Sequence, residues 1–160
     1  MSRRLHGWRS TDRRHADGAI DSAQRVVATE PLVEPSEEGA RRLGAAYWRA
    51  ATRAGRGLVR RRERDGRVEL RLLGVPLLTF DGPEVAAGPD QMTCTYRISG
   101  GLLARRPGGS LTLEQHGAEL AVAVEGFVPR LALIHRPLQS RLHAAVSRRY
   151  FRRLLAETRA

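Results

Sequence analysis

The chain has 160 residues, enough for one domain with a substantial core, and a net charge of +11. All 28 basic residues are arginine, and lysine and asparagine are absent, which indicates the codon bias of a GC-rich bacterial genome. The charge favours an acidic partner. A lone cysteine, Cys94, excludes an internal disulfide, and no apolar stretch is long enough to span a membrane. These features predict a soluble, cytoplasmic protein.

Residues 1–34 are rich in arginine and show no sustained hydrophobic period. Segments of this composition bury too little apolar surface to fold alone. The sequence therefore predicts a disordered tail over residues 1–34, followed by a single α+β domain over residues 35–160. The alternative is a basic arm that folds onto an anionic partner.

A helix is predicted over residues 37–54. Ser36 is a favourable N-cap, and Glu37 and Glu38 fall in the first turn, where the helix dipole favours acidic side chains. Apolar residues keep to one face of this segment, and Gly55 follows at a position where helices commonly end.

The Asp65–Gly66 dipeptide is the strongest local signal in the chain. Asp-Gly between two strand-like segments favours a two-residue hairpin turn, which pairs Arg64 with Arg67 and Val59 with Leu72. Alternation along the strands then gathers on one face Arg60, Arg62, Arg64, Arg67 and Arg71, with Glu69 as the only acid among them. Such a face is either an anion-binding surface or the solvated outside of a sheet.

Further strands are predicted downstream. A short strand over residues 77–80 ends at an Asp-Gly-Pro turn, and residues 91–98 alternate cleanly between polar and apolar. A second hairpin turns at His116–Gly117, which pairs Leu113 with Leu120.

The last predicted element is an amphipathic helix over residues 137–157, with Pro137 in its first turn. The fold class is therefore α+β: a curved, mainly antiparallel sheet of about five to seven strands, with an N-terminal helix and a long C-terminal helix packed on it.

The second half of the chain resembles the START-related helix-grip superfamily (SRPBCC), which includes polyketide cyclase-like and lipid-transfer proteins. The resemblance is carried by residues 109–114, the return strand 119–125 and residues 147–151 of the closing helix. It implies a ligand cavity between a curved antiparallel sheet and the C-terminal helix. The superfamily pattern also begins with a strand before the first helix, for which the candidate here is residues 25–29.

A ligand pocket between this sheet and the C-terminal helix is the main functional hypothesis. The predicted lining residues are Met92, Cys94, Tyr96, His143, Ser147 and Tyr150, and Tyr96 and His143 would orient the ligand by hydrogen bonds. Ordinary core roles are the alternative, with Cys94 as a small buried hydrophobe and His143 as a hydrogen-bonded core residue.

A glycine-rich connection over residues 100–109 contains Arg105 and Arg106. Backbone donors and arginine side chains in such a loop can hold a phosphate or carboxylate. The predicted anion-binding residues are Arg60, Arg62, Arg64, Arg105 and Arg106.

No catalytic, nucleotide-binding or metal-binding motif is present, and the sequence predicts no cofactor. The predicted function is binding of a small hydrophobic or amphipathic ligand. One alternative is a basic module that binds nucleic acid or an anionic surface; the other is a cyclase- or aromatase-like enzyme that uses the same pocket. The sequence gives no oligomeric state.

Overall fold

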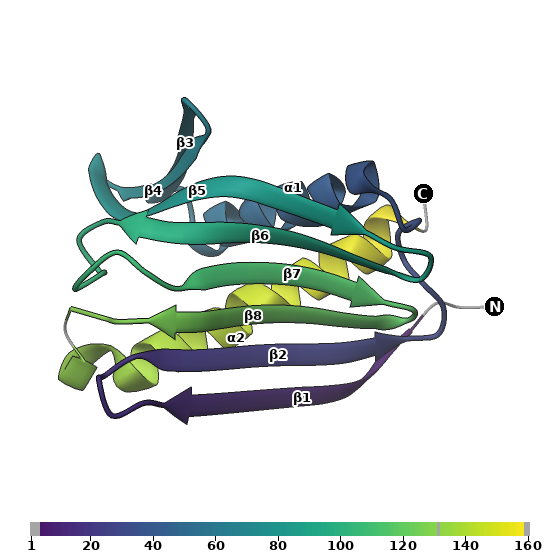
Figure 1. The fold of residues 1–160 in the computed structure, drawn as a ribbon, viewed down its shortest axis with the longest axis horizontal. Helices are drawn as coiled ribbons and strands as arrows, with labels where there is room; N and C mark the ends of the chain where they lie inside the picture. Colours follow the sequence, from purple (N-terminus) through teal and green to yellow (C-terminus); the bar gives the residue numbers. More distant parts are fainter. Residues whose placement is uncertain (1–3, 131, 159–160) are drawn as a thin grey trace.

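A computed structural model describes residues 4–130 and 132–158, of which residues 132–140 are described by their backbone alone. This part of the chain forms one antiparallel sheet of eight strands and two helices (Figure 1). The predicted α+β class is confirmed. The predicted strand number is corrected, since the sheet has eight strands rather than five to seven.

The strands are β1 (Leu5–Arg14), β2 (Ile20–Ala28), β3 (Val59–Arg64), β4 (Arg67–Leu72), β5 (Val75–Ala87), β6 (Gln91–Gly100), β7 (Ser110–His116) and β8 (Glu119–Phe127). The helices are α1 (Glu37–Ala54) and α2 (Ala132–Glu157). The strand order is β1-β2-β8-β7-β6-β5-β4-β3, so that β1 and β3 are the two edges. Neither helix has, over its described residues, the length and apolarity required to cross a membrane.

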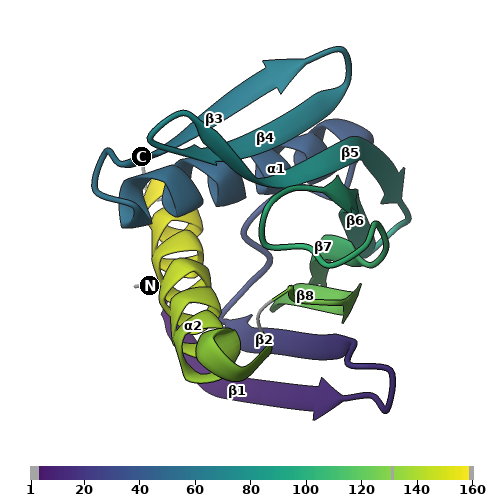
Figure 2. The same cartoon turned by 90° about the vertical axis from the view of Figure 1, so that its left-hand side faces the viewer.

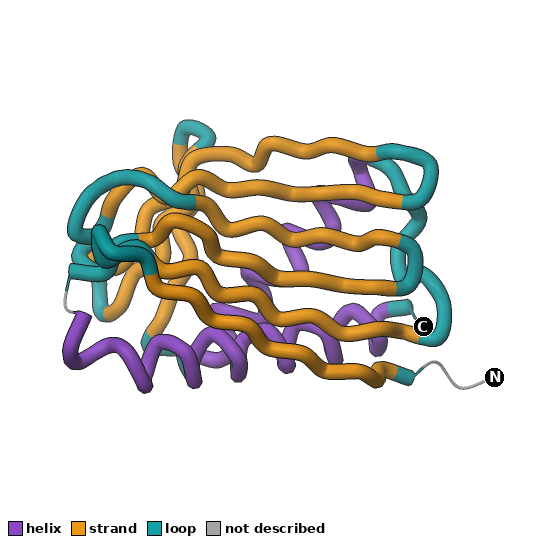
Figure 3. The backbone as a smooth tube through the Cα atoms, turned by 60° about the horizontal axis from the view of Figure 1, so that its bottom comes forward, coloured by secondary structure: helices purple, strands orange, loops and turns teal. Residues whose placement is uncertain are grey.

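The sheet is strongly curved, and both helices lie on its concave side (Figure 2). The backbone trace shows the strands side by side, with the helices together on one side of them (Figure 3). α1 contacts β3, β5, β6 and β7, whereas the strands that α2 contacts most are β1 and β2. The two helices also pack against each other, so each covers a different part of the concave face.

The N-terminal segment departs most from the sequence prediction. In place of the disordered tail predicted over residues 1–34, of which residues 1–3 lie outside the described residues, the structure has the β1–β2 hairpin, and β2 pairs antiparallel with β8. The physical reason is that β8 supplies the hydrogen-bonding edge that this segment lacks by itself. Val26 and Ala28 of β2 are buried, and Leu5 and Trp8 of β1 pack against the core.

Local signals elsewhere are confirmed. Ser36 caps α1 by accepting a hydrogen bond from the Gly39 backbone N–H at 2.9 Å. The β3–β4 hairpin has the register predicted from its Asp-Gly turn, from Arg64↔Arg67 to Val59↔Leu72.

Two predicted boundaries and one predicted strand register are corrected. β5 is a continuous strand that passes through the predicted Asp-Gly-Pro turn with a register shift between Asp81 and Glu84. The second hairpin pairs His116 with Glu119, so Leu113 faces Val122 rather than Leu120. A displacement of two residues leaves every side chain on its predicted face. α2 begins at Ala132, before Pro137.

Helix and sheet are in close contact where α1 crosses β6. A Cβ atom on Gly44 would lie 2.6 Å from the hydroxyl of Tyr96 and 2.8 Å from the sulfur of Cys94. Both side chains are almost fully buried, so neither has space to move away. Gly44 is therefore required for α1 to approach the sheet this closely.

We expect Gly44→Ala to lower the free energy of unfolding by about 2 kcal/mol, because the added methyl group overpacks this contact. Alanine favours helix formation by about 1 kcal/mol relative to glycine, so propensity alone predicts the opposite sign. Urea denaturation measures the change, with Arg42→Ala on the exposed face of α1 as the control. A Gly44→Ala variant as stable as the parent would contradict the packing.

Candidate functional site

The candidate site is the contact between the β1–β2 hairpin and α2, which we call the seam. β2 and α2 run in the same direction along it (Figure 1). Ser22 of β2 contacts His143 of α2, and further along Val26 and Phe151 line one groove. The seam therefore places the inward face of β2 against one face of α2.

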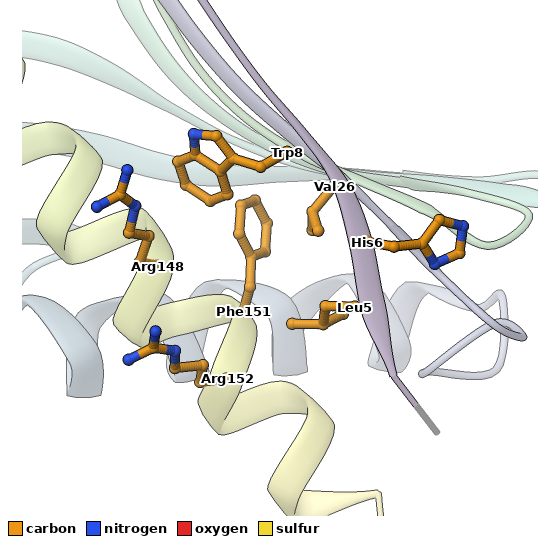
Figure 4. Close-up of a pocket in the computed structure, with 7 residues that line it drawn as sticks. All are labelled: Leu5, His6, Trp8, Val26, Arg148, Phe151 and Arg152. Carbon is orange, nitrogen blue, oxygen red and sulfur yellow. The ribbon is translucent and has the colours of Figure 1, made fainter. Parts of the chain in front are cut away.

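The groove has a volume of about 380 Å³ and opens to the surface between β1 and α2. Its lining residues are Leu5, His6, Trp8, Val26, Arg148, Phe151 and Arg152 (Figure 4). Phe151 and Val26 are buried and form its floor, while Arg148 and Arg152 are exposed at its rim. Apolar walls with charged groups at the rim are typical of sites for amphipathic ligands.

Aromatic side chains shape this groove. The rings of Trp8 and Phe151 meet edge to face with their centroids 5.8 Å apart. The guanidinium of Arg148 lies 5.0 Å from the Trp8 ring centroid, within cation–π distance. Neither Arg148 nor Arg152 forms an ion pair with any acidic side chain in the described part of the chain.

A chain of hydrogen bonds lies further along the seam. The Ser22 hydroxyl donates to Asp12 on β1 at 2.5 Å, and its oxygen lies 3.1 Å from Nδ1 of His143. A carboxylate only accepts hydrogen bonds, so the single Ser22 proton is directed to Asp12. Nδ1 of His143 must then carry a hydrogen and donate a hydrogen bond to the Ser22 oxygen. Nε2 of the neutral ring therefore keeps its lone pair.

Burial lowers the pKa of His143 to about 4, and the negative charge of Asp12 opposes this shift. The imidazole is therefore neutral at pH 7. Although the residue as a whole is only half-buried, its Nε2 is inaccessible to solvent and has no hydrogen-bond partner among the described residues.

Other polar atoms on β2 and α2 share this condition. Oε1 of Gln24, Oγ of Ser147 and the Tyr150 hydroxyl are all buried without a hydrogen-bond partner in the described chain. Gln24 uses only its amide group, which donates to Ser10 at 2.6 Å. A buried polar group that lacks a partner costs about 1–3 kcal/mol, so each of these groups requires an explanation.

The predicted ligand-binding residues fall into two groups. Met92, Cys94 and Tyr96 lie on the inward face of β6 beneath α1, where Gly39 and Gly44 contact them closely. Burial raises the pKa of the Cys94 thiol and of the Tyr96 hydroxyl, so both groups stay protonated at neutral pH.

His143, Ser147 and Tyr150 form the second group, on one face of α2. His143 lies at the seam, and Ser147 follows it by one helical turn. Tyr150, however, lies beside the first group, since its ring packs on Tyr47 with the centroids 5.7 Å apart. Burial is the main cause that raises the pKa of the Tyr150 hydroxyl, and the field of nearby Cys94 adds to it. None of the six predicted residues lines the groove.

The predicted anion-binding arginines lie on different elements. Arg60, Arg62 and Arg64 are exposed on the edge strand β3, which Figure 1 shows standing away from the body of the sheet. Arg105 and Arg106 lie on the β6–β7 connection, where Arg106 pairs with Asp17 at 2.8 Å. The structure therefore does not assemble all five into one site.

Other members of the hairpin's arginine face have acidic neighbours, of which only Asp81 lies outside the hairpin. Arg67 pairs with Asp81 of β5, and Arg71 pairs with Glu69. Arg64 approaches Asp65 at 3.3 Å in a fully exposed pair. Arg60 and Arg62 have no such partner in the described part of the chain.

Sequence reasoning missed Trp8, Asp12, Ser22 and Gln24, all within the predicted tail. One available signal was the Asp17–Gly18 dipeptide in the loop between β1 and β2. It is the same dipeptide that located the β3–β4 hairpin.

Among the described residues, no three His, Cys, Asp or Glu side chains gather closely enough to hold a metal ion. No protein-family model matches the sequence, and neither the curated proteins nor the solved structures include a significant match.

The neutral state of His143 makes the stability of the protein depend on pH. Unfolded histidine binds a proton below pH about 6.5, whereas folded His143 does so only near pH 4, so the unfolded state gains stability as the pH falls between these values. We expect the parent to lose about 2–3 kcal/mol more than a His143→Gln variant across this window.

Urea denaturation at several pH values measures this difference. His116→Gln at the exposed β7–β8 turn, where the imidazole pairs with Asp90 at 3.2 Å, is the control for removal of a histidine from the surface. If the His143→Gln and parent curves were parallel from pH 7 to pH 4, the neutral buried imidazole would be excluded.

Proposed function

We propose that the protein binds a small amphipathic anion, such as a carboxylate with an apolar chain or ring, in the groove between β1 and α2. The observation that carries the proposal is an apolar groove with two arginines at its rim, neither of which has an acidic partner among the described residues. The proposal keeps the ligand class and the sheet–helix location that the sequence predicts.

The charge at the rim favours an acidic group over a neutral one. Arg148 and Arg152 are four residues apart on α2, so their side chains leave the helix on the same face. Two guanidinium groups on one face can bind a single carboxylate through charge-assisted hydrogen bonds. The apolar part of the ligand would then lie along Trp8, Phe151 and Val26.

The volume limits the ligand to a small molecule. Ligand pockets in proteins commonly measure about 300–1,000 Å³, and a groove of 380 Å³ lies near the lower limit. A medium-length alkyl carboxylate or an aryl carboxylate fits this volume better than a two-chain lipid.

The two tryptophans of the chain provide a direct test. Trp8 borders the groove, whereas Trp48 is buried in the core beneath the sheet. Because bromine quenches indole fluorescence on contact, 11-bromoundecanoate should quench Trp8 saturably. The effect should disappear in a Trp8→Phe variant, in which Trp48 is the remaining emitter. The neutral 11-bromoundecanol should bind about tenfold more weakly, because it cannot pair with the arginines.

Arginine variants separate the role of the rim from that of net charge. Arg152→Gln should weaken bromoundecanoate binding about fivefold, whereas Arg153→Gln, which removes the same charge one position along α2, should not. Arg153 is already paired with Glu157 at 2.8 Å. Equal binding of the acid and the alcohol, or no saturable quenching, would refute the proposal.

A second candidate function, binding of nucleic acid or another polyanion, is supported by the β3–β4 hairpin. Arg60 and Arg62 are exposed on an edge strand and have no acidic partner in the described chain. Two such arginines can contact neighbouring phosphates, and contacts of this kind are strongly salt-dependent.

We expect a fluorescent oligothymidylate to bind the parent at low salt, with an affinity that falls as salt rises. Loss of two phosphate contacts in an Arg60→Ala/Arg62→Ala variant should reduce the slope of log affinity against log salt by about 1.4. Arg67→Ala is the control, because Arg67 already pairs with Asp81. Absence of binding at low salt, or a slope unchanged in the double variant, would remove this candidate.

Two broader assignments also remain proposals. A relationship to the helix-grip superfamily is supported by the curved antiparallel sheet, the long C-terminal helix and a strand, β2, before the first helix. A cytoplasmic location is supported by the single cysteine, Cys94, which is buried and unpaired.

A further inference from the structure

The buried polar atoms of the seam lie beyond the groove and are not explained by it. Gln24 is two residues after Ser22 on the inward face of β2, a distance of about 6.7 Å along a strand. Ser147 is four residues after His143 on α2, a distance of about 6 Å along a helix. Because β2 and α2 run in the same direction and Ser22 meets His143, Gln24 faces Ser147.

Contacts on the far side support this alignment. Val26, two residues after Gln24, lines the groove together with Phe151, which is four residues after Ser147. Gln24 and Ser147 are thus bracketed by the Ser22–His143 contact on one side and by the shared groove on the other. Both are completely buried, with exposed fractions of 0%.

The hydrogen-bonding capacity left in this region has a definite pattern. Nε2 of His143 is an acceptor, because the hydrogen of the neutral ring is on Nδ1, which donates a hydrogen bond to Ser22. Oε1 of Gln24 is a second acceptor, because the amide group already donates to Ser10. The Ser147 hydroxyl remains as a donor, since it does not form the bond to the preceding helical turn that serines in helices often make.

We propose that Gln24, His143 and Ser147 form a buried binding site for an oxygen that both donates and accepts hydrogen bonds: an enclosed water molecule or the hydroxyl group of a ligand. A water molecule complements the three groups, donating to His143 and Gln24 and accepting from Ser147. A ligand hydroxyl would satisfy one acceptor and the serine. Buried waters usually make about three hydrogen bonds to groups that otherwise lack partners.

The hydrogen bonds from His143 to Ser22 and from Ser22 to Asp12 determine which nitrogen of His143 is the acceptor in this site. Asp12 is exposed on β1, so the chain extends from the protein surface to the enclosed face of the imidazole. It fixes the proton on Nδ1 and directs the Nε2 lone pair away from Ser22. Ser22 is therefore a positioning residue for His143. The site uses none of the groove residues and stands even if the groove binds nothing.

The tautomer of His143 is the first test. In the full-length protein labelled with ¹⁵N-histidine, long-range ¹H–¹⁵N correlations at pH 7 should show the proton on Nδ1 and an unprotonated Nε2. Exposed His116 serves as the reference in the same spectrum, and a His143→Gln variant assigns the signal. A proton on Nε2 would overturn the proposal.

Cross-relaxation identifies the bound oxygen. Water in the site should give a persistent cross-peak to Hε1 of His143, and this peak should remain when decanoate is added. If 10-hydroxydecanoate replaces that peak with one from the ligand, the oxygen belongs to a ligand hydroxyl; if it does not, the site holds water. Absence of any such cross-peak, with or without the hydroxy acid, would contradict the site.

Ser22→Ala tests the positioning role with a readout that stability alone does not change. We expect the proton of His143 to redistribute towards Nε2 and the water cross-peak to weaken, while the remaining spectrum stays folded. Ser99→Ala is the matched control, because it removes a buried, unpartnered serine hydroxyl from β6 and should leave the His143 signals unchanged. A Ser22→Ala variant with the parent tautomer would contradict the role assigned to Ser22.

Discussion

Pairing of β2 with β8 is the constraint on which the rest of the structure depends. It adds the N-terminal hairpin to a sheet that otherwise ends at β8 and extends the concave face by two strands. These are the strands that α2 contacts most. Without them, the apolar face of α2 would have mainly α1 to pack against, and both the groove and the His143 hydrogen-bond chain would be lost.

The interior is divided chemically between the two helices. Beneath α1, the inward face of β6 carries Met92, Cys94, Tyr96 and Ile98, and the packing is close enough to require Gly44. Beneath α2, the inward face of β2 carries Ser22 and Gln24, and the facing side of α2 carries His143 and Ser147. Polar groups in an interior reduce stability unless they are satisfied, so the unpartnered atoms of Gln24, His143 and Ser147 support the buried site proposed above.

Elements whose geometry is set by neighbouring residues could be predicted from the sequence. The Asp65–Gly66 turn fixed the register of β3 and β4, Ser36 fixed the start of α1, and regular alternation identified the buried face of β6. β2 could not be recognised in this way, because its inward positions include Ser22 and Gln24 and the alternation is therefore obscured. The residues that give the seam its polar character are the ones that concealed the strand.

The site was predictable only in part for a related reason. His143 and Ser147 could be placed on the inner face of α2 from helical periodicity, but Ser22, which contacts His143, comes from β2, more than a hundred residues earlier. Likewise, Met92, Cys94 and Tyr96 share the expected face of β6, yet the sequence did not indicate that α1 rather than α2 would cover them. Long-range pairing of strands decides both outcomes.

The most direct test of the central claim, that the seam is where this protein binds its ligand, is chemical-shift mapping of the ¹⁵N-labelled chain during titration with decanoate. The account predicts saturable changes concentrated in β1, β2 and the second half of α2, including the Trp8 indole N–H. Changes confined to the β3–β4 hairpin, or none at millimolar decanoate, would contradict it.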